Sequence, residues 1–221
     1  MNSRLQPVLS PRDLPLAELC SARLDGEVFS LGDFWCPVDE LDDCPSRARA
    51  AGLLVSPRAI AERLTAVWIY GLAPEPGQHQ FCVNVSARVH LVPSPRLRIR
   101  EVRCAPDQVQ TISGLRVTLP LRTCVDLARW NTEAAPGADA DMHPLQRGAL
   151  VPLIAALLRF AGHTSVEPAR RLCTGANLPF KVQALARLDE AQALMEAAVL
   201  NDALLDDASP QQAPRPRIAP E

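Results

Sequence analysis

One stretch of the chain, residues 112–129, constrains the fold most, because it joins a strand pattern directly to a helix pattern. A Ser-Gly turn signal at 113–114 precedes a short run of β-favouring residues. Pro120 follows at a place where the first turn of a helix tolerates its missing N–H. We expect the hydroxyl of Thr118 to cap this helix. The stretch therefore predicts a β-strand that runs straight into a buried helix.

Three segments resemble the AbiEi-family antitoxins, the DNA-binding halves of type IV toxin–antitoxin pairs. Residues 114–129, GLRVTLPLRTCVDLAR, are similar to that family's G-x-x-V-T-x-P-x-R-T-x-x-D-L-A segment, and Arg122 and Asp126 within it can pair on one helix face. Residues 59–71 resemble the family's S/T-A-A-x-x-x-G helix, and residues 24–37 resemble its short hairpin. The resemblance, over residues 14–130, is carried by Thr65, Trp68, Gly71, Gly114, Val117, Thr118, Pro120, Arg122, Thr123 and Asp126. We expect most of these to be structural.

The resemblance implies a regulator. Members of the family repress their own operon through an N-terminal DNA-binding part, and their C-terminal part blocks a nucleotidyltransferase toxin, largely through charge. It thus implies a non-enzymatic type IV antitoxin that binds operator DNA, a nucleotidyltransferase-type toxin, or both. Two alternatives stay open: a protein-interaction module that has lost DNA binding and, with less support, an enzyme acting on nucleotides.

Composition limits the class of protein. The 221 residues are 48% hydrophobic, which is enough for one or two compact domains with a real core. The net charge of −2 gives no general attraction to nucleic acid. Seven cysteines without a C-x-x-C pair, and no apolar leader, favour a cytoplasmic protein with reduced thiols. No apolar segment reaches the ~18 residues of a membrane span, so we expect no membrane partner.

We expect an α+β fold. Its parts, in order, are a truncated winged-helix-like unit (1–43), an α+β antitoxin-like core with a small mixed β-sheet and helices (44–130), a linker (131–143), a C-terminal helical bundle (144–205) and a disordered tail (206–221). The first unit is truncated because only one helix and a hairpin fit into it, whereas a winged helix-turn-helix has two more helices before them.

Periodicity and turn signals predict the individual elements. The helices beside the one at Pro120 cover residues 15–24, 45–54, 56–72, 145–161, 165–174 and 179–204, and the strands cover 27–30, 33–36, 80–85 and 96–103. Thr164 and Glu167 have the spacing of a capping box. Leu185, Leu188, Leu194, Met195 and Val199 are expected to form the apolar face of the last helix. Trp68 and Tyr70 are interpreted as core rather than as a platform for stacking bases.

The predicted hairpin is acidic. Residues 25–43 contain seven Asp or Glu and no Lys or Arg. A wing that touches DNA should be basic, because phosphate contacts supply most of the affinity. A solvated acidic hairpin is therefore the favoured interpretation. The alternative is a surviving DNA contact through Arg12 and Arg23.

The basic residues gather between residues 86 and 104. Arg96, Arg98 and Arg100 alternate with Leu97 and Ile99, which predicts a half-buried strand. Either acidic segments of the chain offset these charges, or they form a docking surface for an acidic partner or for phosphates. The arginines assigned to partner binding are Arg88, Arg96, Arg98, Arg100 and Arg103. Reversing the charge of Arg96, Arg98 and Arg100 is expected to abolish partner capture without unfolding the protein.

Signals for catalysis are poor. The sequence has no phosphate-cradling glycine loop, no H-E-x-x-H and no G-x-S-x-G motif. Asp139 and Asp141 have the spacing of a nucleotidyltransferase metal pair, but they lie in linker-like composition, and we interpret this as coincidence. The four histidines have no partner at metal-ligand spacing. We therefore expect no catalytic residue, no metal, no cofactor and no small-molecule substrate.

Overall fold

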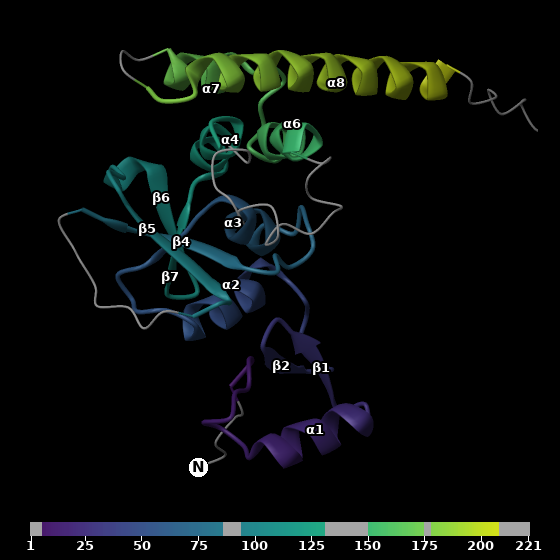
Figure 1. Cartoon of the computed structure of the whole chain (residues 1–221). Helices are drawn as coiled ribbons and strands as arrows, with labels where there is room; N and C mark the ends of the chain where they lie inside the picture. Colours follow the sequence, from purple (N-terminus) through teal and green to yellow (C-terminus); the bar gives the residue numbers. More distant parts are fainter. Residues whose placement is uncertain (1–5, 86–93, 131–149, 175–177, 208–221) are drawn as a thin grey trace, which may run out of the picture.

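The protein is described by a computed structural model that covers residues 6–85, 94–130, 150–174 and 178–207, with side chains up to residue 201. Figure 1 shows the N-terminal helix and hairpin at one end, the main sheet in the middle and the C-terminal helices at the other end. Helices and two small sheets alternate along the chain, so the predicted α+β class is confirmed. None of the described helices is both long and apolar enough to cross a bilayer.

The N-terminal unit is a helix followed by a hairpin, as predicted. Helix α1 (Leu16–Leu24) precedes strands β1 (Val28–Leu31) and β2 (Phe34–Pro37), which pair in antiparallel fashion. Gly32 makes the turn with a φ of 63°, a conformation that glycine adopts without steric cost. The unit has its own small hydrophobic cluster, formed by Leu9, Leu19 and Val28.

Helix α2 (Cys44–Leu53) agrees with the predicted helix at 45–54. It begins where the carboxylate of Asp43 accepts a hydrogen bond from the N–H of Ser46 at 2.9 Å, which satisfies one of the free donors of the first turn. Pro45 in the first turn fits for the same reason, because it has no N–H to satisfy.

The predicted helix at 56–72 is wrong in its first half. Residues 60–61 form strand β3 (Ile60–Ala61), and only α3 (Arg63–Ile69) is helical. β3 pairs with strands on both sides, so backbone pairing in the centre of the sheet overrides the local helical period. The end of the helix is as predicted: Gly71 has a φ of 78°.

The main sheet has the order β5-β4-β3-β7-β6 and is mixed, as predicted. β3 runs antiparallel to β4 and parallel to β7. The other strands are β4 (His79–Asn84), β5 (Leu97–Val102), β6 (Val109–Ile112) and β7 (Leu115–Thr118), and a short 3-10 turn, η1 (Pro106–Gln108), precedes β6. Because β5 is an edge strand, its arginines lie at the side of the sheet.

The stretch from β7 into helix α4 (Pro120–Ala128) forms as predicted, with Pro120 in the first turn. The predicted cap is wrong, however. Leu119 occupies the N-cap position without a side-chain bond. The hydroxyl of Thr118 instead donates to the carbonyl of Ala61 at 3.3 Å and lies 2.7 Å from the hydroxyl of Thr123. Thr118 is the last residue of β7, and its side chain connects β3 to the side chain of Thr123 in α4 instead of capping the helix.

Trp68 and Tyr70 lie in the core, which confirms that interpretation. The hydroxyl of Tyr70 donates to the carbonyl of Thr118 at 2.6 Å and accepts a bond from Gln110 at 2.9 Å. Burial raises the pKa of Tyr70 to about 12. The ring therefore helps to fasten α3 to β7.

The C-terminal helices are α6 (Leu150–Phe160), α7 (Glu167–Cys173) and α8 (Lys181–Asp207). α4 and α6 lie side by side and both pack against α8, and one hydrophobic cluster runs from the sheet through these helices (Figure 1). The predicted capping box is wrong, because α7 begins at Glu167 itself and Val166 takes the N-cap position.

The buried face of α8 differs from the predicted one. Its buried residues include Leu188 and Met195 together with Ala184 and Ala191. Leu194 is 44% exposed and Val199 is 65% exposed, so these two do not belong to the face. Small alanines let α8 lie close to α6, which the apolar pattern did not reveal.

Two expected segments fall largely or wholly outside the described residues. The predicted linker at 131–143 lies wholly outside them. Of the predicted tail, residues 208–221 lie outside them. α8 extends to Asp207, two residues into that tail. The predicted domain boundaries themselves stay predictions.

Candidate functional site

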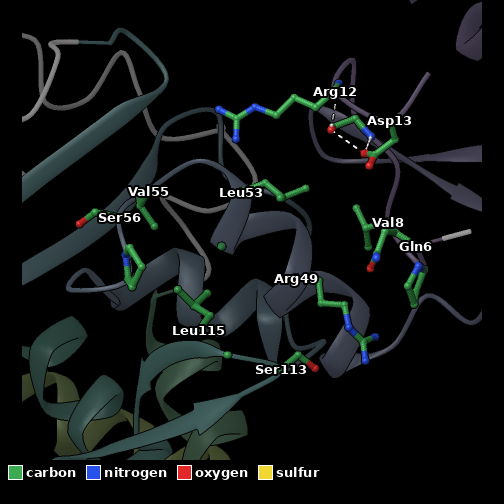
Figure 2. Close-up of a pocket in the computed structure, with 15 residues that line it drawn as sticks. Gln6, Val8, Arg12, Asp13, Arg49, Leu53, Val55, Ser56, Ser113 and Leu115 are labelled. Atoms are coloured by element: carbon green, nitrogen blue, oxygen red, sulfur yellow. Dashed lines mark hydrogen bonds between the residues drawn. The ribbon is translucent and has the colours of Figure 1, made fainter. Parts of the chain in front are cut away.

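A first cavity of about 400 Å³ lies between the N-terminal unit and the core (Figure 2). Arg12 and Arg49 line it from the two sides. Asp13 also lines it, but its carboxylate is engaged by the N–H and the hydroxyl of Ser10 at 2.9 and 2.7 Å. Arg23 is exposed on α1 and does not line the cavity. Arg12 and Arg49 thus face the same cavity from opposite sides, and Arg23 does not take part in it.

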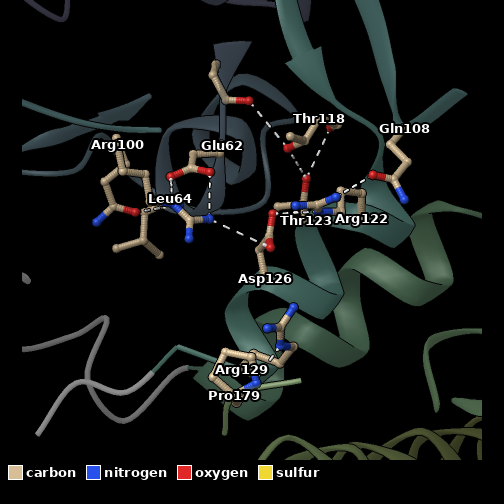
Figure 3. A network of polar contacts seen from close by, with 12 residues as sticks. Glu62, Leu64, Arg100, Gln108, Thr118, Arg122, Thr123, Asp126, Arg129 and Pro179 are labelled. Atoms are coloured by element: carbon tan, nitrogen blue, oxygen red, sulfur yellow. Dashed lines mark hydrogen bonds and ion pairs between the residues drawn. The ribbon is translucent and has the colours of Figure 1, made fainter. Parts of the chain in front are cut away.

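A chain of polar contacts connects β3, β5 and α4 (Figure 3). Glu62 is 1% exposed, and its two carboxylate oxygens accept hydrogen bonds from Arg100 at 2.5 and 2.7 Å. Arg100 also lies 3.7 Å from Asp126, which accepts a 2.9 Å hydrogen bond from Arg122. Arg122 in turn donates to Gln108. The predicted Arg122–Asp126 pair therefore forms and extends into a network that fastens the edge strand to α4.

Burial of Arg100 disfavours its charged form, but the hydrogen bond and the charge of Glu62 outweigh that effect. Together they raise the pKa of Arg100 above its ordinary value. Because Arg100 donates both hydrogen bonds to the buried carboxylate of Glu62, removing Arg100 leaves that carboxylate without these two donors.

A second cavity, of about 480 Å³, opens beside this network. We call it the arginine pocket. Its lining residues are Arg63, Arg98, Arg100, Val102, Arg103, Arg122, Asp126, Arg129, Trp130, Pro179 and Phe180. They come from α3, from β5 and the residue after it, from α4 and the two residues after it, and from the turn before α8. Residues far apart in the sequence therefore converge on one strongly basic cavity.

Among the residues that the structure describes, only part of this charge is neutralised. Glu62 and Asp126 offset Arg100 and Arg122. Arg98 and Arg103 make no ion pair or hydrogen bond with any residue that the structure describes. Six arginines against these two carboxylates leave four positive charges uncompensated by the described part of the chain. The pocket is therefore a site that an anion would stabilise.

Arg63 lies deepest in this arrangement. Its guanidinium carbon lies 4.9 Å from the centre of the Trp130 ring, and its Nε is buried without a hydrogen-bond partner among the described residues. Burial and the charge of Arg100 lower the pKa of Arg63 to about 10, so it is still charged at neutral pH. A cation in this position is a donor that lacks an acceptor.

The structure divides the arginines that were assigned to partner binding. Arg98, Arg100 and Arg103 line the arginine pocket. Arg96 instead pairs with Asp33 of the N-terminal hairpin and with Glu75, each at 2.9 Å. Acidic side chains of the same chain therefore offset the charge of Arg96, which is the first of the two interpretations of the arginine strand. Arg88 lies outside the described residues.

Sequence reasoning missed Arg63 and Arg129 and placed Arg122 only among the structural residues. No local pattern marks Arg63 or Arg129, because they reach the pocket only through the packing of α3 and α4 against β5. Among the described residues, no group of three His, Cys, Asp or Glu side chains is placed to hold a metal ion. Asp139 and Asp141 lie outside them.

Glu75 is expected to make the stability of the fold depend on pH. Burial disfavours its charge, but the hydrogen bond with His79 at 3.0 Å and the charge of Arg96 outweigh this and hold the pKa of Glu75 below its ordinary 4.5. Its stabilising contribution is therefore present above pH 4.5 and is lost as the pH falls further. We expect Glu75→Gln to flatten the acid side of the curve of Tm against pH. An acid side as steep as that of the natural protein would contradict this.

Comparison with known proteins bears on the same region. Residues 51–147 match the family described as the AbiEi antitoxin C-terminal domain, and this range contains every arginine of the pocket. No curated protein matches. The crystal structure of the RV2827C protein from Mycobacterium tuberculosis aligns with 88% of this chain and 76% of its own, at 16% identity and a TM-score of 0.41. The resemblance that the motif residues predict is confirmed over residues 51–147, where the chain is similar to the AbiEi antitoxin C-terminal domain.

Proposed function

We propose that this chain is a non-enzymatic antitoxin and regulator of a type IV toxin–antitoxin pair in the cytoplasm. The rim of its arginine pocket would bind an acidic surface of a nucleotidyltransferase-type toxin. The observation that carries the proposal is the uncompensated charge on a domain of this family. A partner attracted by charge needs cations that the protein does not neutralise itself. Arg98 and Arg103, both exposed and unpaired among the described residues, meet that requirement.

The variant R98E/R103E tests the toxin contact. We expect it to lose capture of the toxin encoded by the adjacent reading frame, with Kd at least about tenfold higher, because truncating or reversing a close interfacial charge costs more than ~1.4 kcal/mol. The control R58E/R171E makes the same change in net charge at two exposed arginines outside the pocket. Equal loss of capture in both variants, measured by pull-down and titration, would contradict the proposal.

Arg100 is unsuitable for that test. The expectation that Arg96, Arg98 and Arg100 can be reversed together without unfolding conflicts with the buried position of Glu62, which would then face a second carboxylate. Reversal of Arg96 would likewise place a carboxylate beside Asp33 and Glu75. The two unpaired arginines therefore give the cleaner experiment.

DNA binding is the second part of the proposed function, and the assignment of Arg12 and Arg23 to it stays a prediction. If the N-terminal unit binds the operator, a gel shift with the gene's own upstream region should persist from low to moderate salt, and R12E/R23E should weaken it. The acidic hairpin favours the alternative, an interaction module without DNA binding. That alternative predicts no complex, or one that unrelated DNA forms equally well and that moderate salt removes.

An enzyme that acts on nucleotides is the least supported alternative. Only the spacing of Asp139 and Asp141 suggests it. It predicts that Asp141→Ala abolishes a nucleotide-transfer activity of the purified chain, whereas we expect no such activity in the natural protein.

A further inference from the structure

The interior of the arginine pocket has the dimensions of a small-molecule site. Its volume of about 480 Å³ falls within the range of roughly 300–1,000 Å³ that such sites occupy. A protein surface can reach the exposed Arg98 and Arg103, but Arg63 lies deeper, against Trp130. A slender anion is required to reach all of these cations at once.

The chemistry of the lining favours phosphate. Arginine presents its N–H donors in a planar fork that matches the oxygens of phosphate groups. Four arginines around one cavity have no counter-charge among the described residues. They are suited to a chain of two or three phosphates, since each phosphate carries one to two negative charges near neutral pH. A single carboxylate would leave most of that charge unbalanced.

Phe180 adds an aromatic face. It lines the pocket and is 48% exposed, although burying a ring of this size is ordinarily favourable. Trp130 lies beneath Arg63 and is buried, so Phe180 is the aromatic side chain on which the planar ring of a ligand can stack.

The backbone of the pocket is strained. Arg63 has a φ of 48° and Phe180 a φ of 60°. Among the described residues only one other non-glycine residue, Ser113, has a positive φ, and it lies in a hairpin turn. Such strain in bulky residues is costly and tends to gather at ligand sites. Two of the three strained residues therefore lie in the same basic cavity.

We propose that the arginine pocket binds a nucleoside di- or triphosphate, with the phosphates held by Arg63, Arg98, Arg103 and Arg129 and the base stacked on Phe180. The ligand is bound and not converted. This inference goes beyond the proposed function and does not depend on it, although a nucleotide in the pocket would compete with a toxin bound at its rim.

Calorimetric titration of the full chain, without any toxin, tests the site. We expect ATP or GTP to bind, the corresponding nucleoside without phosphates not to bind, and tripolyphosphate to bind about tenfold more weakly because it lacks the base. R98E/R103E should weaken triphosphate binding at least tenfold, whereas R58E/R171E should leave it within about threefold.

Phe180→Ala separates a nucleotide from a bare phosphate chain. It should weaken binding of the nucleotide about tenfold and leave binding of tripolyphosphate unchanged. Three results would overturn the proposal: no heat of binding with millimolar triphosphate, equal losses in R98E/R103E and R58E/R171E, or tripolyphosphate that binds as tightly as the nucleotide. Since no toxin is present, none of these results bears on toxin capture.

Discussion

Replacing Arg100 by alanine is expected to lower the free energy of unfolding by about 3 kcal/mol. Glu62 is 1% exposed and receives two hydrogen bonds from Arg100. Without that guanidinium, the buried carboxylate loses its hydrogen-bonded counter-charge, and the cost of removing one partner of a buried pair is several times the net value of the pair. Urea unfolding followed by tryptophan fluorescence measures the effect.

Arg98→Ala is the matched control, because Arg98 lies two residues away on the same edge strand but makes no ion pair with any described residue. Its free energy of unfolding should stay within about 0.5 kcal/mol of that of the natural protein. Similar losses in the two variants would mean that the Glu62–Arg100 pair does not stabilise the fold.

Leu157→Ala in α6 is expected to cost about 3 kcal/mol, through lost burial and the cavity that it leaves. Leu157 is completely buried in α6, which packs against both α4 and α8. Because one hydrophobic cluster joins the sheet to these helices, the variant should lower stability by the same amount whichever part of the chain reports it.

Two probes separate the parts. The three tryptophans, at 35, 68 and 130, lie before the C-terminal helices, so their fluorescence reports the N-terminal unit and the core. Far-ultraviolet circular dichroism is dominated by the helices. We expect the fluorescence and circular dichroism transitions to coincide, because one hydrophobic cluster joins the core to α6–α8. A shift of the circular dichroism transition alone would show that α6–α8 fold as an independent unit.

Local signals predicted the parts of the fold that depend on local chemistry. Pro120 marks the start of α4, Gly71 the end of α3 and the residues at 113–114 the hairpin turn, because each of these depends on the φ or the N–H of that residue itself. β3 was missed because Ile60 and Ala61 carry no strand signal of their own. Their conformation comes from pairing with β4 and β7.

The candidate site was predicted in part. Alternation along residues 96–100 identified Arg98 and Arg100, since a strand places such residues on one face. The same pattern grouped them with Arg96, because it contains no information on the acidic side chains at Asp33 and Glu75 that take up that arginine. Arg63 and Arg129 join the site only after α3 and α4 have packed, and spacing along the chain does not reveal such convergence.

Growth rescue in cells tests the central claim most directly, namely that unpaired arginines at the rim of the pocket bind the partner. The proposed nucleotidyltransferase-type toxin is induced together with the natural chain, with R98E/R103E or with R58E/R171E, at matched protein levels. The account predicts that the natural chain and R58E/R171E restore growth and that R98E/R103E does not. Rescue by R98E/R103E equal to that of the natural chain would contradict it.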